Sequence, residues 1–225
     1  MNINGWARET HAYNNLKELT ENIYYDTNGK MCENIDGYAR NTFKYDGYGN
    51  WIEVSYYGAD GKLCLKREGY ARVTFKYDKR GNEIEQAYYG VDGEPCVSHR
   101  GIARITSSYD EYGNLIESAY YGVDGNLCLS KRHGTARVVS KYDDRGNEIE
   151  EACYGLDGNL CMCYDNYAIV KYKYNNQNKL IEQSFHDTES NLCMSRSGYA
   201  RATIEYHEEG RTIHFYDDKG EEITE

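Results

Sequence analysis

Cysteine is the residue of this chain whose type and spacing most readily suggest chemistry. The sequence has 225 residues and eight cysteines. Thiols form disulfides, bind zinc or act as nucleophiles, but zinc sites need close pairs of the CxxC kind, which are absent. Six of the cysteines recur in one register, so stacked repeats would place them in a column of small hydrophobic side chains. This column comprises Cys32, Cys64, Cys96, Cys128, Cys161 and Cys193, and we expect Cys153 and Cys163 to lie near Cys161.

Two other residue types could support chemistry, and neither does so in a recognisable pattern. Asp-Gly pairs such as Asp60-Gly61 and Asp92-Gly93 recur, but one carboxylate per pair is too few for a calcium loop. The six histidines share no register, and no phosphate-binding loop or serine elbow is present. We therefore predict a protein that is not an enzyme, with no catalytic, cofactor-binding or metal-binding residues.

Charged and aromatic residues also recur in columns. Arginine and glutamate recur once in nearly every repeat, and Tyr-Tyr doublets precede a glycine. One interpretation is pairing between neighbouring strands, with arginine stacked on tyrosine. The other is a surface that binds a partner, because aromatic residues and arginine are frequent in binding hot spots. The candidate partner-binding residues are Tyr57, Tyr89, Tyr121, Arg40, Arg72, Arg104 and Arg137.

These columns exist because the chain repeats itself seven times with a period of about 32 residues. The units begin near Gly5, Gly37, Gly69, Gly101, Gly134, Asn166 and Gly198. The single 33-residue step places one extra residue between Cys128 and Gly134, which predicts a connector there. The first and last copies are atypical, and the last has lost two residues in its return strand and carries Ile223 in the cysteine register. We expect residues 1–225 to be a single repeat domain whose end units act as caps.

One copy shows how a unit is built. Residues 71–77 alternate apolar and polar side chains, which predicts a half-buried strand. Asp78-Lys79-Arg80-Gly81 suits a three-residue hairpin loop with a bulge, and Glu83–Tyr89 is the predicted return strand. In each tyrosine doublet one ring should be buried and the other exposed, since neighbouring strand residues face opposite ways. Pro95-Cys96-Val97 is predicted to be a short third strand.

Composition limits the class of protein. Leu, Ile, Val and Phe make up only about 16% of the chain, but 25 tyrosines supply enough apolar ring area for a core. The net charge of -11 argues against nucleic acid as a partner. No apolar run is long enough to span a membrane and no signal peptide is visible, so we expect a cytoplasmic location, unless the chain is a fragment of a larger protein.

Short motifs resemble known bacterial repeats. Tyr77-Asp78-Lys79-Arg80-Gly81-Asn82 resembles the YD repeats of RHS-type proteins, and Tyr120-Tyr121-Gly122-Val123-Asp124-Gly125 resembles MORN-like hairpin repeats. Ile23–Met31 is similar to part of a choline- or glucan-binding cell-wall repeat. Each match covers 6–10 residues of a unit, and no functional residue is carried over. The shared implication is a β-hairpin repeat with a binding, scaffolding or encapsulating role.

The sequence therefore predicts an all-β fold, a tandem array of seven β-hairpin units of about 32 residues. We expect an open β-solenoid or elongated twisted sheet, with a closed seven-bladed ring as the alternative. The predicted function is a non-catalytic repeat scaffold that binds a protein partner along its repeated surface. The alternative is carbohydrate or cell-envelope binding through an aromatic row.

Overall fold

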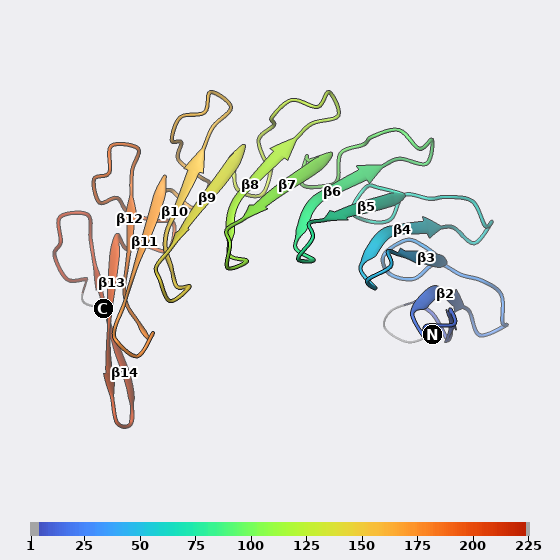
Figure 1. Cartoon of the computed structure of the whole chain (residues 1–225), viewed down its shortest axis with the longest axis horizontal. Coiled ribbons are helices and arrows are strands. Elements are labelled where there is room, and N and C mark those ends of the chain that lie inside the picture. Colours follow the sequence, from blue (N-terminus) through green and yellow to red (C-terminus); the bar gives the residue numbers. More distant parts are fainter. Residues whose placement is uncertain (1–4, 224–225) are drawn as a thin grey trace. The chain divides into compact units, whose positions relative to one another are not determined.

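The structure, a computed structural model, describes residues 5–223, which form fourteen antiparallel strands and no helix. The strands follow one another in chain order in one sheet, and each repeat contributes one hairpin (Figure 1). This order has two ends, so the open array of hairpins is confirmed and the closed ring is not formed. Consistent with the prediction of no membrane span, residues 5–223 include no helix long and apolar enough to cross a bilayer.

The strands have closely similar lengths in every repeat. They are β1 (Arg8–Tyr13), β2 (Leu19–Tyr25), β3 (Arg40–Tyr45), β4 (Trp51–Tyr57), β5 (Arg72–Tyr77), β6 (Glu83–Tyr89), β7 (Arg104–Tyr109), β8 (Leu115–Tyr121), β9 (Arg137–Tyr142), β10 (Glu148–Tyr154), β11 (Ile169–Tyr174), β12 (Leu180–His186), β13 (Arg201–His207) and β14 (Gly210–Tyr216).

The chain folds as two compact units, which we describe separately. Unit 1 comprises the residues up to Thr106 together with Tyr121–Asn126. Unit 2 comprises Ser107–Tyr120 and the residues from Leu127 onward. The single repeat domain expected from the sequence stays a prediction.

The hairpin turn is the one that the sequence predicts. In the β5–β6 hairpin, Asp78 accepts hydrogen bonds through its side chain from the backbone N–H groups of Arg80 and Asn82. Gly81 has a φ of 88°, and the pairing shifts register after Lys76, as a bulged three-residue loop requires. Lys17 replaces this glycine in the first repeat and also takes a positive φ, of 64°.

The last hairpin is shorter, but not where the sequence analysis placed the loss. β14 has seven residues, like the other return strands. The two missing residues are missing from the turn, because His207 pairs directly with Gly210 and leaves a two-residue loop. A deletion within a strand would shift its pairing with the neighbouring strand, whereas a turn can lose residues without such a shift. The shorter sequence is therefore accommodated in the turn. Ile223 does occupy the cysteine position, since its N–H donates to the carbonyl of Phe215 as Cys96 does to Tyr88.

The connector between repeats consists of two tight turns rather than a strand. The predicted third strand is wrong: in the third repeat only Pro95 forms a bridge, to Tyr89. The Asp-Gly pairs make the first turn, where the Asp92 carboxylate accepts the N–H of Glu94, as expected of turn chemistry. The extra residue between Cys128 and Gly134 lies between β8 and β9, so it does fall in a connector.

One face of the sheet carries the larger core cluster, and a smaller cluster around Ala152 and Ile169 lies on the other face in unit 2. Val54, Tyr56, Val73 and Tyr88 are buried on the first of these faces in unit 1. The first tyrosine of three doublets, at Tyr24, Tyr56 and Tyr88, belongs to this core, as predicted, whereas Tyr120 of the fourth doublet is only half-buried. The tyrosine rings of this core contact one another in edge-to-face and tilted pairs, with the centroids of successive rings 4.8–5.9 Å apart. The unit 1 series runs through Trp6, Tyr24, Tyr38, Tyr56, Tyr70 and Tyr88, and the unit 2 series through Tyr167, Phe185, Tyr199 and Phe215.

Candidate functional site

The candidate partner-binding residues come together on the opposite face of the sheet. Each arginine guanidinium lies over the tyrosine that ends the paired return strand. Arg40 lies over Tyr57 at 4.7 Å from the ring centroid, Arg72 over Tyr89 at 4.4 Å, and Arg104 over Tyr121 at 4.1 Å. Arg137 lies over Tyr154 at 4.4 Å, a ring that sequence reasoning did not select because a cysteine precedes it.

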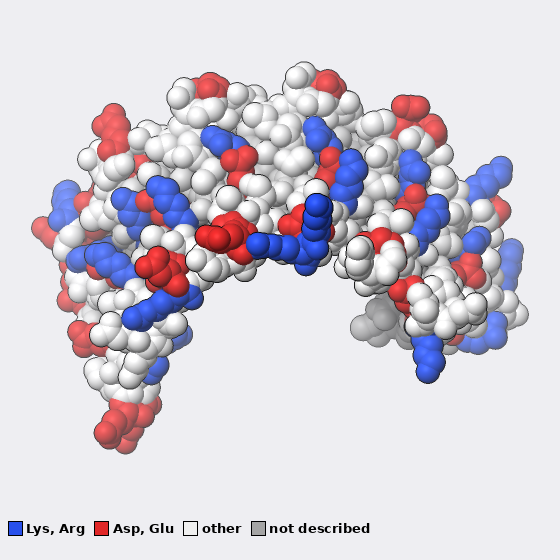
Figure 2. All heavy atoms as spheres, in the orientation of Figure 1, with Lys and Arg blue, Asp and Glu red and all other residues white. Residues whose placement is uncertain are grey.

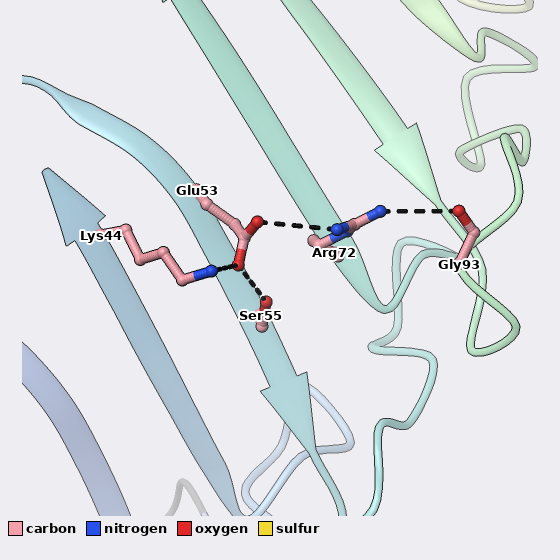
Figure 3. A network of polar contacts seen from close by, with 5 residues as sticks. All are labelled: Lys44, Glu53, Ser55, Arg72 and Gly93. Carbon is pink, nitrogen blue, oxygen red and sulfur yellow. Dashed lines mark hydrogen bonds and ion pairs between the residues drawn. The ribbon is translucent and has the colours of Figure 1, made fainter. Parts of the chain in front are cut away.

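The same arginines form ion pairs with glutamates of the preceding repeat. Figure 3 shows one such network, in which Glu53 on β4 lies between Lys44 on β3 and Arg72 on β5. The carboxylate of Glu53 is 2.8 Å from Lys44 Nζ and 3.6 Å from the Arg72 guanidinium, and it accepts a hydrogen bond from the Ser55 hydroxyl. We call this repeated set of Lys, Glu, Arg and Tyr the charge ladder. Its other arginine pairs are Arg40–Glu21, Arg104–Glu85 and Arg137–Glu117.

The charge ladder is electrically mixed rather than basic. Figure 2 shows basic side chains lying beside acidic ones over the face in view. The four candidate arginines keep 31–35% of their side-chain surface exposed. Their charge is paired with a glutamate, and the flat face of the guanidinium lies on a tyrosine ring. Pairs at this exposure contribute about 0–1 kcal/mol each to stability. The arrangement matches the pairing interpretation, and the arginines retain only part of their surface for a partner.

A second candidate site lies in unit 2, where the repeat departs from its own pattern. Four positions on the core face differ between the third and fifth repeats. Three exchange an aromatic ring for a small side chain, and one exchanges a neutral side chain for an acidic one. Tyr70 is replaced by Thr135, Phe75 by Ser140, Gln86 by Glu151 and Tyr88 by Cys153. Thr135 and Cys153 therefore supply no ring at this point, and the fully buried Thr135 hydroxyl has no hydrogen-bond partner.

These replacements leave a hollow of about 530 Å³ on the core face of unit 2. A hollow of this size is ordinary for a small-molecule site. The side chains that line it come from β8, β9, β10, β11 and the two connectors between these strands, and include Ser140, Glu151, Cys153, Cys163, Tyr167 and Tyr172. We call it the unit 2 hollow. Sequence reasoning missed it: a comparison of the copies shows the replaced residues, but only the strand register shows that they share one face.

The unit 2 hollow is acidic and aromatic. Its described lining includes Glu148, Glu151 and Asp165 but no lysine or arginine, and His133 is its one basic side chain. Burial raises the pKa of Glu151, and the nearby Glu148 raises it further. The Tyr167 hydroxyl donates a 3.4 Å hydrogen bond to the Glu151 carboxylate. The site therefore holds a carboxyl group whose negative charge is poorly compensated.

Two thiols meet in the wall of the same hollow. Cys153 and Cys163 are both buried and form a hydrogen bond with each other. This hydrogen bond lowers the pKa of Cys163, the acceptor, and together with burial raises the pKa of Cys153. Cys161 is also near Cys153, as expected from the sequence. No group of three or more metal-ligating side chains within residues 5–223 is arranged to hold a metal ion.

The six cysteines in register are half-buried, and three of them donate hydrogen bonds to the preceding repeat. The thiol of Cys64 donates to the carbonyl of Gly37 in the preceding repeat at 3.7 Å, and Cys96 donates to Gly69 at the same distance. Burial raises the pKa of both thiols, which disfavours the thiolate and thus nucleophilic chemistry. The predicted column is therefore an inter-repeat contact.

A third surface feature recurs along the connectors. The residue after each cysteine in register is an aliphatic or methionine side chain in several successive repeats, and it is exposed. Leu65 is 53% and Val97 46% exposed in unit 1, and Leu129 is 44% and Met162 39% exposed in unit 2. We call these four the connector aliphatics. Exposed apolar side chains that recur in one register are not required by the core of a repeat.

No family model matches the chain, and no curated protein matches it either. Among solved structures, the crystal structure of TcdB2-TccC3 is similar over 92% of this chain at 12% identity, with a TM-score of 0.36. The Photorhabdus luminescens Tc holotoxin pore has a TM-score of 0.34, and TcdB2-TccC3-Cdc42 has 14% identity and a TM-score of 0.27. The match spans 12–13% of each of those chains. Similarity of this size assigns neither a family nor a function to the chain.

Proposed function

We propose that this protein is a non-catalytic repeat scaffold that binds a protein partner along its repeated surface. The observation that carries the proposal is the recurrence of the connector aliphatics at one position of successive repeats. Apolar side chains exposed in register present the same contact several times, and apolar contact area is a common source of affinity in protein interfaces. The YD-like and MORN-like motifs are consistent with this role, because such bacterial hairpin repeats bind, scaffold or encapsulate.

The charge ladder is the second part of the proposed surface. Tyr57, Tyr89 and Tyr121 present rings already covered on one side by Arg40, Arg72 and Arg104. A partner would therefore contact arginine and tyrosine edges as a preformed unit, which reduces the entropy lost on binding. In this proposal the ladder contributes specificity and the connector aliphatics contribute most of the affinity.

Paired surface variants test this division. A partner captured by the wild-type chain would be measured for affinity against Leu65→Ser/Val97→Ser and against Arg72→Ala/Arg104→Ala. The matched control is Lys62→Ser/Glu94→Ser, which changes two exposed polar residues of the same repeats. We expect the aliphatic variant to bind at least about tenfold more weakly, the ladder variant to lose less, and the control to bind like wild type. Equal affinity of all three variants would overturn the proposal.

Carbohydrate binding is the second candidate, and one feature of unit 1 favours it. Tyr48 is 94% exposed and Trp51 46% exposed. Tyr48 lines a shallow hollow with Ile52, Phe75 and the polar turn residues Asp46 and Arg80, a mixture that suits a sugar ring. A soluble glucan that quenches the tyrosine and tryptophan fluorescence of wild type but not that of Tyr48→Ala would support this candidate. No quenching at saturating glucan would remove it.

A further inference from the structure

The unit 2 hollow lies where the fourth and fifth repeats depart from the core pattern, and the fifth repeat departs most. At the same register, the third repeat buries Tyr88 and packs the half-buried Tyr70 and Phe75 against the same core. Replacing large core rings by threonine, serine and cysteine sacrifices packing, and such cavities cost several kcal/mol when they arise by mutation. A loss of that kind at three coincident positions is better explained by a ligand than by the needs of the fold.

The chemistry of the lining specifies a cation. Glu148, Glu151 and Asp165 contribute carboxylates, whereas Glu117, which also lines the hollow, is already paired with Arg137 at 3.0 Å. Tyrosine rings from three strands and one connector complete the wall, namely Tyr120, Tyr142, Tyr167 and Tyr172. Carboxylates attract positive charge, and aromatic faces stabilise a cation that has left water.

The geometry points to a binding site for an alkylammonium group, and we propose that the unit 2 hollow takes such a group. The ammonium would pair with Glu151 between the tyrosine rings, and its alkyl chain would occupy the space that Tyr88 fills in the third repeat. The same chemistry is presented by a free aliphatic amine and by a lysine side chain of a protein partner. This inference stands apart from the proposed scaffold role, because it needs neither the connector aliphatics nor the charge ladder.

The test is a calorimetric titration of the full chain with matched probes. The cationic probes are n-butylammonium and the end-blocked peptide Gly-Gly-Lys-Gly-Gly, and the comparison probes are 1-butanol and butyrate. We expect saturable binding of at least one cationic probe, with butanol and butyrate at least about tenfold weaker. A peptide that binds as tightly as butylammonium identifies a lysine side chain as the source, and a peptide at least tenfold weaker identifies a free amine. Failure of both cationic probes to bind, or equal binding of butanol, would overturn the proposal.

Variants assign the binding to the hollow. Glu151→Gln keeps the shape of the side chain and removes its charge, and we expect it to weaken the cationic probe at least about tenfold. Glu182→Gln is the control, because Glu182 lies in the same unit but pairs with Lys173. Cys153→Tyr restores the ring of the other repeats and should abolish binding by filling the space. Unchanged affinity in folded Glu151→Gln would refute the assignment, with folding checked by circular dichroism.

Discussion

At the scale of single residues, the informative positions are those where one repeat differs from the others. Glu151 stands where Gln86 and Gln183 stand in the third and sixth repeats, and Cys153 stands where those repeats carry Tyr88 and Phe185. The repeat explains the side chains that conform, because stacking requires the same contact in every copy. The exceptions therefore carry the information about a site. The cysteines in register were expected to form a column in the core. In the structure they are half-buried, and Cys64 and Cys96 each donate a hydrogen bond to the preceding repeat.

The first residue-scale prediction concerns Glu151 and stability. Its raised pKa means that the folded protein holds this proton more tightly than the unfolded chain does. Ionisation therefore lowers the stability of the fold as the pH rises from the ordinary glutamate range through the raised pKa. We expect Glu151→Gln to be more stable than wild type to urea at about pH 8 and equally stable at about pH 3.5, below the usual glutamate pKa.

Other titrating groups around Glu151 define the control for this measurement. They are Glu117 and Tyr120 on β8, Tyr142 on β9, Glu148 and Cys153 on β10, Tyr172 on β11, and His133, Cys163, Asp165 and Tyr167 on the connectors. These groups remain in Glu151→Gln, so the difference between the two proteins isolates Glu151. A stability difference that does not grow between the two pH values would contradict the prediction.

The second residue-scale prediction concerns thiol reactivity. The hydrogen bond from Cys153 lowers the pKa of Cys163, whereas burial raises the pKa of Cys64 and Cys96. The thiolate is the reactive form, and Cys163 opens onto the unit 2 hollow. At about pH 7 we expect iodoacetamide to modify Cys163 at least about tenfold faster than Cys96 in native protein, measured by peptide mass mapping. Cys153→Ala should slow the modification of Cys163, and equal rates at Cys163 and Cys96 would refute the argument.

At the scale of the element, the hairpin was predictable because its determinants are local. Alternating side chains gave the strands, and Asp78 with Gly81 gave the turn and its bulge. The connector was predicted less well, because a short apolar run such as Pro95-Cys96-Val97 suits both a strand and a turn that packs on the core. Proline lacks the N–H that a regular ladder needs, and only one bridge forms there.

Gly81 and Gly47 provide a matched test of the turn. Gly81 has a φ of 88°, Gly47 has no positive φ, and a Cβ at either position would meet nothing within 4 Å. Gly81→Ala should therefore destabilise the protein by about 1 kcal/mol through backbone strain alone. Gly47→Ala should be neutral or slightly stabilising, because alanine restricts the unfolded chain. Chemical denaturation measures both, and equal free energies of unfolding in the two variants would count against the assigned turn.

At the scale of the whole molecule, the sequence predicted the open array of hairpins because a repeat fixes which faces must stack. It could not predict the hollow, because the volume arises from several substitutions whose coincidence in space depends on strand register. The register places Val138 opposite Cys153, as Val73 is placed opposite Tyr88. With that register known, the replaced residues are seen to share one face.

A reciprocal exchange of side chains tests whether the hollow is a local loss of stability. In a repeat array stability is close to a sum of contributions from repeats and their neighbours, so a packing defect should weaken the unit that holds it. We expect the amides of Val139 and Ala152 in unit 2 to exchange hydrogen faster than their counterparts Thr74 and Ala87 in unit 1, measured by native-state hydrogen exchange.

Cys153→Tyr should slow that exchange in unit 2, because the ring restores the packing present at Tyr88. Tyr88→Cys should create the defect in unit 1 and accelerate exchange at Thr74 and Ala87, at a cost of about 3 kcal/mol. Each variant is the other's control, since the same two side chains are exchanged at equivalent positions. If Cys153→Tyr destabilises unit 2 as much as Tyr88→Cys destabilises unit 1, then the fifth repeat has repacked around its small residues and the hollow is not a missing ring.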